Sequence, residues 1–415
     1  MFLKLAINSL IDRKGAVSLS VVAMAISITI LLGVEHIRQE VKQNFSSTVS
    51  GVDLIVGART SNVNLLLYSV FRIGAPTNNI SWKSFKNFAA DPRVDWAVPI
   101  SLGDSHKGHG VVGTVPNYFD HFSYGKNNHL AFYEGAVFTE AFEVVLGFEV
   151  ASREGYGIGD TIVLAHGMSE VSFALHDKYP FTVVGVLEPT ATPVDRTVYI
   201  SLAGMEAIHS DWPNKSTSAT DSLPNQEKLG QVKVEQITAF MLKLKNRLST
   251  FKFQNEVKNY HEEPLTAILP GVALSELWGF TALLENSFFL VSIFVFTSAC
   301  VGMSAMLFSS IRDRTREMKL LRIVGASPSV LFFLIEVEAL LIALVGIFLG
   351  LGFVFILIFF FQDYLLIEYG ISVGKNILSQ SVGKMLFAIL IMSFLSALVP
   401  SFYVYRKNIS LQQTQ

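Results

Sequence analysis

The stretch 311-IRDRTREMKLLRIVGAS-327 lies between two long apolar runs and decides how the chain is placed in a membrane. It holds five cations, Arg312, Arg314, Arg316, Lys319 and Arg322. A loop this basic beside membrane spans marks the cytoplasmic side. Arg312, Arg316 and Lys319 follow i, i+4, i+7 spacing, which predicts that they share one helical face. Any polytopic protein has basic loops, so the charge alone does not assign a function.

The end of this stretch predicts a tight stop followed by a new helix. Gly325 suits a helix C-terminus, because glycine readily adopts the left-handed conformation that ends many helices. Ser327 and Pro328 are a good N-cap and first position for the next helix. Asp313 and Glu317 lie four residues apart and add negative charge on another face. The expected structure over 311–327 is therefore a short helix and a turn.

The composition of the chain favours a membrane protein. Of 415 residues, 51% are hydrophobic and 16% are charged, whereas about 25% are charged in a soluble globular chain. The net charge of -2 gives no indication of nucleic-acid binding. The single cysteine, Cys300, cannot form an intrachain disulfide, so it does not indicate a redox compartment.

Four apolar segments predict four transmembrane α-helices in a 1+3 arrangement. An amphipathic helix at 1–15 leads into a first span at 16–34. This span is long enough to cross a membrane, because a hydrocarbon core needs about 20 residues. Basic residues before this span put the N-terminus in the cytoplasm. A cleaved signal peptide is the competing interpretation, and it is disfavoured because charged residues follow the run without a small-residue cleavage pattern. Later spans are expected at 276–310, with an exterior extension, at 328–361 and at 384–403.

The crossings place the remaining segments. The loop 311–327 and the tail 404–415 are expected in the cytoplasm, and the short loop 362–383 outside. Residues 35–275 are expected to form one large α/β (α+β) extracytoplasmic domain, long enough for two lobes. Its expected strands cover 52–58, 96–102, 110–115, 142–151, 161–165, 181–187, 197–202 and 237–244. Its expected helices cover 81–90, 202–209 and 249–261, and a flexible surface loop is expected at 212–232.

The third span carries features that favour intramembrane contacts. Gly346-x-x-x-Gly350 offers a close approach between helices. Glu336 and Glu338 are costly in a span unless they face protein, water or the interface. This span is therefore the one expected to pack against another subunit.

Residues 63–71 of the exterior region have a single apolar helical face. It is formed by residues at i, i+3, i+4, i+7 and i+8, namely Val63, Leu66, Leu67, Val70 and Phe71. The face either packs on its own domain or forms a docking surface for an exterior partner or apolar substrate. The candidate contacts of the second interpretation are Leu66, Leu67, Val70 and Phe71.

All nine histidines lie in the exterior region. His106 and His109 are three residues apart, and Asp104, Asp120 and His121 are close in sequence, so ligands for a metal ion could converge here. No HExxH or Cys/His pattern occurs, and histidines avoid apolar spans in any case, so no metal ligand is expected. No GxSxG elbow, paired carboxylate motif or cysteine nucleophile occurs either, so no catalytic residue is expected.

The order of one span, a large exterior domain and three further spans resembles the FtsX/MacB-type permeases, also called type VII ABC transporters, which include lipoprotein-releasing permeases. The loop pattern of this family is close to ERxxEIgxLRalGAs, with a glutamate near the start of the next helix. The matching residues are Arg316, Glu317, Leu321, Arg322, Gly325, Ala326, Ser327 and Glu336. LAINSLIDRKG near the N-terminus, FTVVGVL at 181–187 and Val399-Pro400-Ser401 are further matches. The tail NISLQQTQ departs from the family's usual Pro-x-Glu-Ala-Leu-like ending.

The resemblance implies that a separate cytoplasmic ABC ATPase dimer binds ATP and Mg, and that this chain holds no cofactor. No GxxxxGK[ST] occurs in the sequence, which agrees with that division of labour. The residues then expected to couple the chain to the ATPase are Arg312, Arg316, Glu317, Lys319, Leu321, Arg322, Gly325, Ala326 and Ser327.

The function implied is a permease subunit whose periplasmic domain moves when ATP is hydrolysed, so that a lipoprotein, peptide or amphiphile is extracted or exported. One alternative is an FtsX-like signalling or scaffold subunit that acts on a periplasmic partner without transport. Another is a component of a metal-linked uptake system. The expected partners are the ATPase dimer, a second permease copy, identical or related, a periplasmic protein or lipoprotein, and the bilayer, without nucleic acid. The expected location is the bacterial inner membrane, multi-pass, with both termini cytoplasmic.

Overall fold

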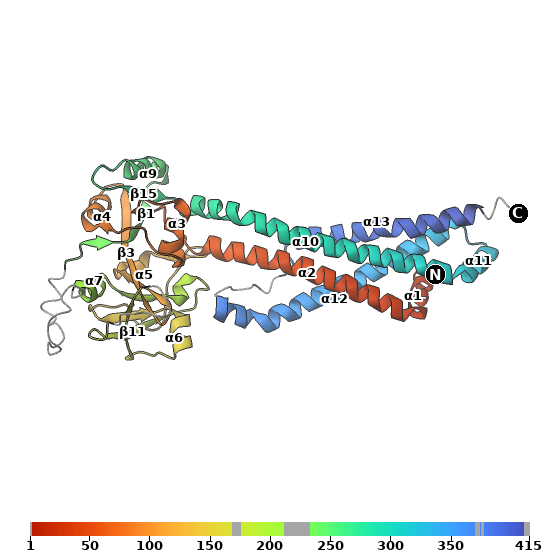
Figure 1. Ribbon diagram of the computed structural model, residues 1–415, viewed down its shortest axis with the longest axis horizontal. Helices are drawn as coiled ribbons and strands as arrows, with labels where there is room; N and C mark the ends of the chain where they lie inside the picture. The colour runs from red at the N-terminus through yellow and green to blue at the C-terminus, as the bar shows by residue number, and fades with distance from the viewer. Residues whose placement is uncertain (1, 168–175, 211–232, 370–373, 375–376, 411–415) are drawn as a thin grey trace. The chain divides into compact units, whose positions relative to one another are not determined.

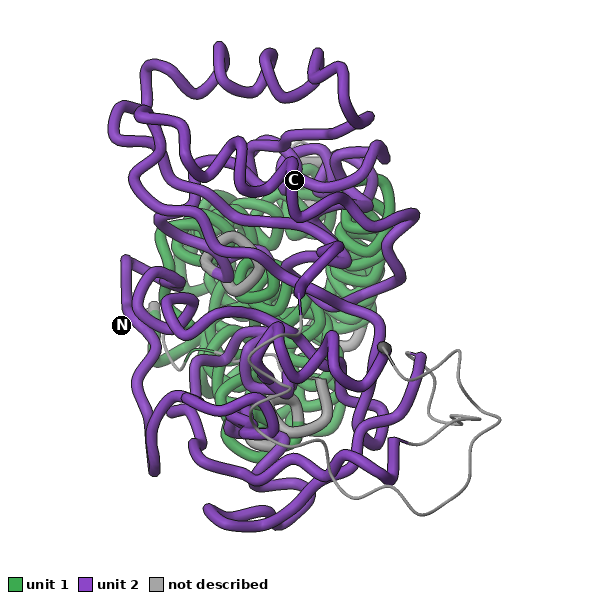
Figure 2. Tube along the Cα trace, turned by 90° about the vertical axis from the view of Figure 1, so that its left-hand side faces the viewer, with its two compact units in different colours: residues 1–41, 282–364, 373–415 green, residues 42–281, 365–372 purple. Residues whose placement is uncertain are grey.

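A computed structural model describes residues 2–167, 176–210, 233–369, 374 and 377–410 of the chain. It divides into two compact units (Figure 2). Unit 1 comprises Met1–Val41, Ala282–Tyr364 and Val373–Gln415, and unit 2 comprises Lys42–Thr281 and Leu365–Ser372. The surface loop expected at 212–232 lies outside the described residues.

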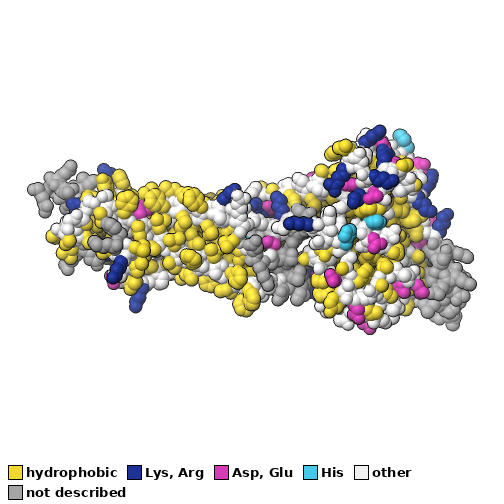
Figure 3. All heavy atoms as spheres, turned by 180° about the vertical axis from the view of Figure 1, so that it is seen from behind, with side chains coloured by type: hydrophobic (Ala, Val, Ile, Leu, Met, Phe, Trp, Pro, Cys, Tyr) yellow, Lys and Arg dark blue, Asp and Glu magenta, His cyan; other side chains and the backbone are white. Residues whose placement is uncertain are grey.

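Unit 1 is helical (Figure 1). Its helices, some of which continue into unit 2, are α1 (Phe2–Asp12), α2 (Lys14–Ser47), α10 (Pro270–Asp313), α11 (Thr315–Ile323), α12 (Pro328–Tyr369) and α13 (Gln380–Ser410). Among the described residues, α2, α10, α12 and α13 are long and apolar enough to cross a membrane. Hydrophobic side chains cover the unit-1 helices in Figure 3, whereas charged side chains gather on unit 2. The predicted 1+3 arrangement of spans is confirmed.

The helices are longer than the apolar segments that predicted them. The first span was expected to end at residue 34, but α2 continues to Ser47. Polar pairing supports the continuation, because Arg38 Nε lies 3.0 Å from Glu35 Oε2 one turn away, and Arg38 Nη1 lies 3.6 Å from Glu285 Oε2 on α10. A helix therefore need not end where its hydrophobicity ends.

The glycines of the third span pack against the first span of the same chain. A Cβ at Gly346 would lie 2.8 Å from Met24 Cγ, and one at Gly350 would lie 2.8 Å from Ile28 Cγ2. Met24 and Ile28 are fully buried in the core of the bundle. The close approach of α2 and α12 thus occupies the face that was expected to meet another subunit.

Unit 2 is built on a mixed sheet of eleven strands with the order β15-β1-β14-β3-β4-β12-β8-β11-β7, in which β10 also pairs with β3 and β9 with β11. The pairs β12–β4 and β11–β8 are parallel, and the other pairs are antiparallel. The strands are β1 (Leu54–Ala58), β3 (Val94–His106), β4 (His109–Thr114), β7 (Phe132–Gly135), β8 (Glu143–Leu146), β9 (Thr161–Ile162), β10 (Ala165–His166), β11 (Phe181–Leu187), β12 (Val198–Ser201), β14 (Ala239–Leu244) and β15 (Leu265–Ile268). This mixed α/β domain confirms the predicted fold class.

The long strand β3 joins two halves of the domain. Its first part pairs with β14, and its second part pairs with β4 and β10. One half has a core with side chains of helices α4 (Trp82–Ala89) and α9 (Thr250–Lys258). The other half has a core with side chains of α6 (Phe148–Glu154) and α7 (Leu202–Ser210). Shorter elements are β2 (Ile80–Ser81), β5 (Ser123–Tyr124), β6 (Asn128–His129), β13 (Gln236–Ile237), α5 (Asn117–His121), η2 (Pro193–Arg196) and η4 (Arg247–Ser249).

One expected strand, 142–151, is only half correct. The strand β8 ends at Leu146, and α6 begins at Phe148. Gly147 lies between the two elements, and a Cβ there would collide with the carbonyl oxygen of Val194, so this position requires glycine. The apolar run continues through both elements, so its hydrophobicity could not show the change from strand to helix.

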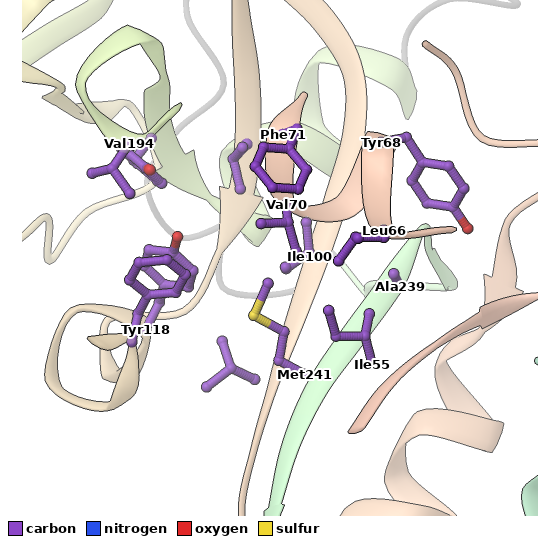
Figure 4. Packing of buried hydrophobic residues seen from close by; sticks show 14 of the residues in the cluster. Ile55, Leu66, Tyr68, Val70, Phe71, Ile100, Tyr118, Val194, Ala239 and Met241 are labelled. Carbon is purple, nitrogen blue, oxygen red and sulfur yellow. The ribbon is translucent and has the colours of Figure 1, made fainter. Parts of the chain in front are cut away.

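The apolar face at 63–71 packs into the core of its own domain (Figure 4). It lies on α3 (Asn62–Leu66) and on a π-helical turn, η1 (Leu67–Phe71). Leu66, Val70 and Phe71 are buried in a cluster with Ile55, Ile100 and Met241, and Leu67 packs against the same cluster. These four side chains are therefore not an exposed docking surface, and the prediction of a partner contact there is wrong.

Candidate functional site

The basic loop of unit 1 contains a break that the sequence pattern did not predict. Helix α10 ends at Asp313, α11 begins at Thr315, and Arg314 between them has φ -99° and ψ 18°. Arg312 is thus on a different helix from Arg316 and Lys319, and the predicted shared face is wrong. The side chains of Arg316, Glu317 and Lys319 lie outside those that the structure describes.

The stop after α11 has the geometry that the sequence predicted. Gly325 has a φ of +101°, which a residue with a side chain rarely adopts. Its N–H donates to the carbonyl of Arg322 at 3.0 Å, and the N–H of Ala326 donates to that of Leu321 at 2.9 Å. This pair of hydrogen bonds is a Schellman stop. Helix α12 then begins at Pro328, directly after Ser327.

An apolar surface lies on the exposed side of α11 and its stop. Leu320, Ile323 and Val324 are 61%, 80% and 86% exposed. Leu321, which was expected to contact the ATPase, is partly buried and packs with Met318 against the helix bundle. The three exposed residues were missed, although their i, i+3, i+4 spacing marks a helical face. Hydrophobic side chains this exposed next to cations are typical of a surface that a partner protein covers.

A buried polar cluster ties the α10–α11 break to other helices of unit 1. Glu338 on α12 is its centre: Arg13 Nη2 donates to Oε2 at 2.9 Å, and Arg314 Nη1 donates to Oε1 at 3.2 Å. The Ser9 hydroxyl on α1 donates to Glu338 Oε1 and accepts from Arg13 Nη2 at 2.7 Å and from Arg314 Nη1. We call these four residues the Glu338 cluster.

The burial of the Glu338 cluster makes it a firm connection. The side chain of Glu338 is 4% exposed, and those of Arg13 and Arg314 are 16% and 19% exposed. A charge removed from water in this way is costly unless it is paired and hydrogen-bonded, and the Glu338 carboxylate meets both conditions. Arg13 Nη1 makes no hydrogen bond with a described residue. The cluster therefore holds the amphipathic helix α1, the break at Arg314 and helix α12 in one arrangement.

Glu336, the glutamate that fits the family pattern, has different surroundings. It is buried, and neither of its carboxylate oxygens makes a hydrogen bond with a described residue. The residue of this span that joins the helices is Glu338, two positions later. The sequence contained a signal for this cluster, because Ser9 and Arg13 are four residues apart on the amphipathic segment.

Comparisons with solved structures include two distant similarities. The periplasmic region of MacB from Actinobacillus actinomycetemcomitans is 12% identical, with a TM-score of 0.35 over 55% of this chain and 94% of that chain. The extracellular domain of the ABC-type transporter YknZ from Gram-positive bacteria is 9% identical, with a TM-score of 0.31 over 52% of this chain and 99% of that chain. A comparison with curated protein sequences found no match.

Family models match most of the sequence. The model of the MacB-like periplasmic core domain matches residues 17–260, and the model of the FtsX-like permease C-terminal region matches residues 288–409. The first match covers most of unit 2 and ends before β15 and helix α10. The second covers the three C-terminal spans with the loop between the first two of them. The chain therefore belongs to the FtsX/MacB-type family of ABC transporter permeases.

Proposed function

We propose that this chain couples ATP hydrolysis by a separate ATPase subunit to movements of its periplasmic core domain, and that these movements extract or export a lipoprotein, peptide or amphiphile. The observation that carries the proposal is α11, an exposed apolar and basic helix tied to the bundle by the Glu338 cluster. The substrate class comes from the resemblance to lipoprotein-releasing permeases.

In this proposal the ATPase dimer docks on α11 and its stop. Leu320, Ile323 and Val324 supply apolar area, and Arg312 and Arg322 supply positive charge that selects an acidic partner surface. The sequence has no GxxxxGK[ST], so ATP and Mg are assigned to the partner. Both termini and this loop lie on the cytoplasmic side of the inner membrane.

Helix α10 transmits the movement in this proposal. It runs from Pro270 to Asp313, directly before the break, and its 44 residues correspond to about 66 Å of continuous helix. A displacement of α11 reaches α10 through Arg314 and reaches α1 and α12 through Glu338. Because packed helices move as rigid bodies, a shift imposed by the ATPase moves the exterior end of α10 and the domain connected to it.

The permease acts as a dimer, since the ATPase does. The partner copy is either this chain or a related permease. Because the glycine face of α12 is occupied by α2, the second copy contacts another side of the bundle.

Reconstitution tests the function. The chain and its ATPase are placed together in vesicles, with a lipid-anchored protein in the outward-facing leaflet. We expect ATP to release this protein and a non-hydrolysable nucleotide to release none. If ATP turnover changes only the activity of an exterior partner and releases nothing, the FtsX-like signalling function replaces the transport function.

A further inference from the structure

Four metal-binding side chains meet in unit 2, away from the coupling site. They are Asp104 on β3, His166 on β10, His176, which precedes β11, and His209 on α7. One ligand atom from each lies within 4.8 Å of those of the other three. Of these four residues, only Asp104 was named as a possible ligand from the sequence, because the three histidines are separated from it by long stretches of chain.

The local fold explains why these four residues meet. Asp104 and His166 are directly opposite in the antiparallel pair β3–β10, so their side chains lie on the same face of the sheet. The main-chain N–H of His176 donates to the carbonyl of Leu164 at 2.9 Å, which holds His176 beside β10. Helix α7 packs closely on β4, because a Cβ at Gly113 would lie 3.0 Å from Met205 Cβ. His209 follows Met205 by one turn.

The distances from Asp104 are close to those around a tetrahedral ion. Asp104 Oδ1 lies 3.2 Å from His166 Nδ1, 3.4 Å from His209 Nε2 and 3.8 Å from His176 Nε2. Tetrahedral Zn²⁺ with bonds of about 2.0 to 2.2 Å places its ligand atoms about 3.3 to 3.6 Å apart. The three rings stand nearly perpendicular to one another, with interplanar angles of 85°, 71° and 77°. Their ligand nitrogens lie within 4.8 Å of one another.

The tautomer of His209 matches a metal ligand. Its Nδ1 lies 2.8 Å from the carbonyl oxygen of Met205, and a carbonyl can only accept. The proton is therefore on Nδ1, and in the neutral ring Nε2 presents a lone pair toward Asp104 Oδ1. A backbone carbonyl on the second ring nitrogen is the usual support of a metal-bound histidine.

The carboxylate of Asp104 is hydrogen-bonded through only one of its oxygens. The residue is fully buried, and its Oδ2 makes no hydrogen bond with any described residue. Buried charges in proteins are paired or coordinate metals.

We propose that Asp104, His166, His176 and His209 bind one divalent transition-metal ion of the zinc class. Three imidazoles and one carboxylate suit Zn²⁺ better than Mg²⁺ or Ca²⁺, which prefer oxygen ligands. His166 has a side chain that is 47% exposed, and it provides the side from which the ion enters. The ion links β3, β10 and α7 within one half of the domain, whatever the permease transports.

His106 and His109, the two histidines that are three residues apart in the sequence, lie outside this group. His106 is held by the carbonyl of Val163 at 2.8 Å and by the Tyr156 hydroxyl at 3.1 Å. His109 faces Glu154, with Nε2 3.7 Å from Oε1. These two histidines are matched controls, because they are buried in the same domain and do not contact the proposed ion.

Metal titration of the full-length chain tests the proposal. The detergent-purified protein is stripped with a chelator, titrated with Zn²⁺ against a competing indicator, and analysed for bound metal by mass spectrometry. We expect one Zn²⁺ per chain, and Co²⁺ in its place should give the intense visible bands of a tetrahedral site. An adventitious surface ion would give weak, sub-stoichiometric binding, and this result would overturn the proposal.

Variants locate the site. His176→Ala and His209→Ala should each weaken Zn²⁺ binding at least about 100-fold, because even outer-shell losses cost about 10- to 100-fold. His106→Ala and His109→Ala should bind as the parent does. Circular dichroism and the melting of the metal-free proteins show whether each variant folds.

Unchanged affinity in a folded His209→Ala, or a loss in the His106 and His109 variants alone, would refute the assignment. So would a chain that binds no metal but loses stability as His209 deprotonates, since that result identifies an imidazolium–aspartate ion pair.

Discussion

Removing the charge of Glu338 should loosen the whole cytoplasmic end of unit 1. In Glu338→Gln the side chain keeps its volume, but the guanidinium groups of Arg13 and Arg314, at 2.9 and 3.2 Å, lose their anion. Breaking a buried ion pair from one side costs about 3 to 5 kcal/mol. Water reaches both arginines, which are 16% and 19% exposed, so we expect the lower end, about 3 kcal/mol of the free energy of unfolding.

Thermal unfolding of the detergent-purified chain measures this effect. A loss of about 3 kcal/mol should lower the Tm of a unit of this size by about 6 to 12 °C. Glu336→Gln is the matched control, because Glu336 is equally buried and makes no hydrogen bond with a described residue. Its Tm should stay the same or rise. An unchanged Tm in Glu338→Gln, or an equal loss in Glu336→Gln, would refute the role given to the Glu338 cluster.

Two further predictions concern the exposed apolar side of α11 and the contact between α2 and α12. Leu320→Asp or Ile323→Asp should weaken binding of the partner ATPase at least about 10-fold in a pull-down assay, since losing one well-buried apolar contact costs over 1 kcal/mol. Leu248→Asp is the control, because Leu248 is also an exposed leucine but lies in unit 2, and this variant should bind normally. Gly346→Leu should lower the free energy of unfolding by about 1 to 3 kcal/mol, because the new side chain overpacks against α2. Gly352→Leu is the control, and it should leave the Tm unchanged because nothing lies within 4 Å of its added Cβ. Equal Tm values for the two variants would contradict the packing of α12 on α2.

The features that follow from local chemistry could be predicted from the sequence. The four spans follow from long apolar runs, because crossing a membrane demands them. The stop after α11 follows from Gly325, since its φ of +101° is a conformation that favours glycine. Most strands of unit 2 follow from short β-branched runs between turn residues. Each of these depends on neighbours in the sequence, so one sequence suffices.

The features that depend on distant partners could not be predicted. Glu336 and Glu338 are two residues apart in an apolar helix, so both are equally conspicuous in the sequence. What separates them is the approach of Ser9, Arg13 and Arg314 to one side of α12, and this depends on how the bundle packs. The resemblance to the family favoured Glu336, whereas the ion pairs are formed by Glu338.

Periodicity likewise could not decide the role of the apolar face at 63–71. A helix with one apolar stripe must cover that stripe, but the pattern is the same whether its own domain or a partner covers it. The side chains of Ile55, Ile100 and Met241 cover it here, and they come from three separate strands. A tertiary contact therefore answered a question that the spacing left open.

Charge balance separates the two buried polar clusters of this chain and assigns them different roles. The Glu338 carboxylate faces two guanidinium groups, which stay charged at any physiological pH, so this anion has permanent counter-charges within the chain. The Asp104 carboxylate faces only imidazoles, which carry no fixed charge because each is cationic only when it is protonated. Such a group gains a counter-charge by taking up a cation. The first cluster is therefore a joint between helices, and the second is a binding site.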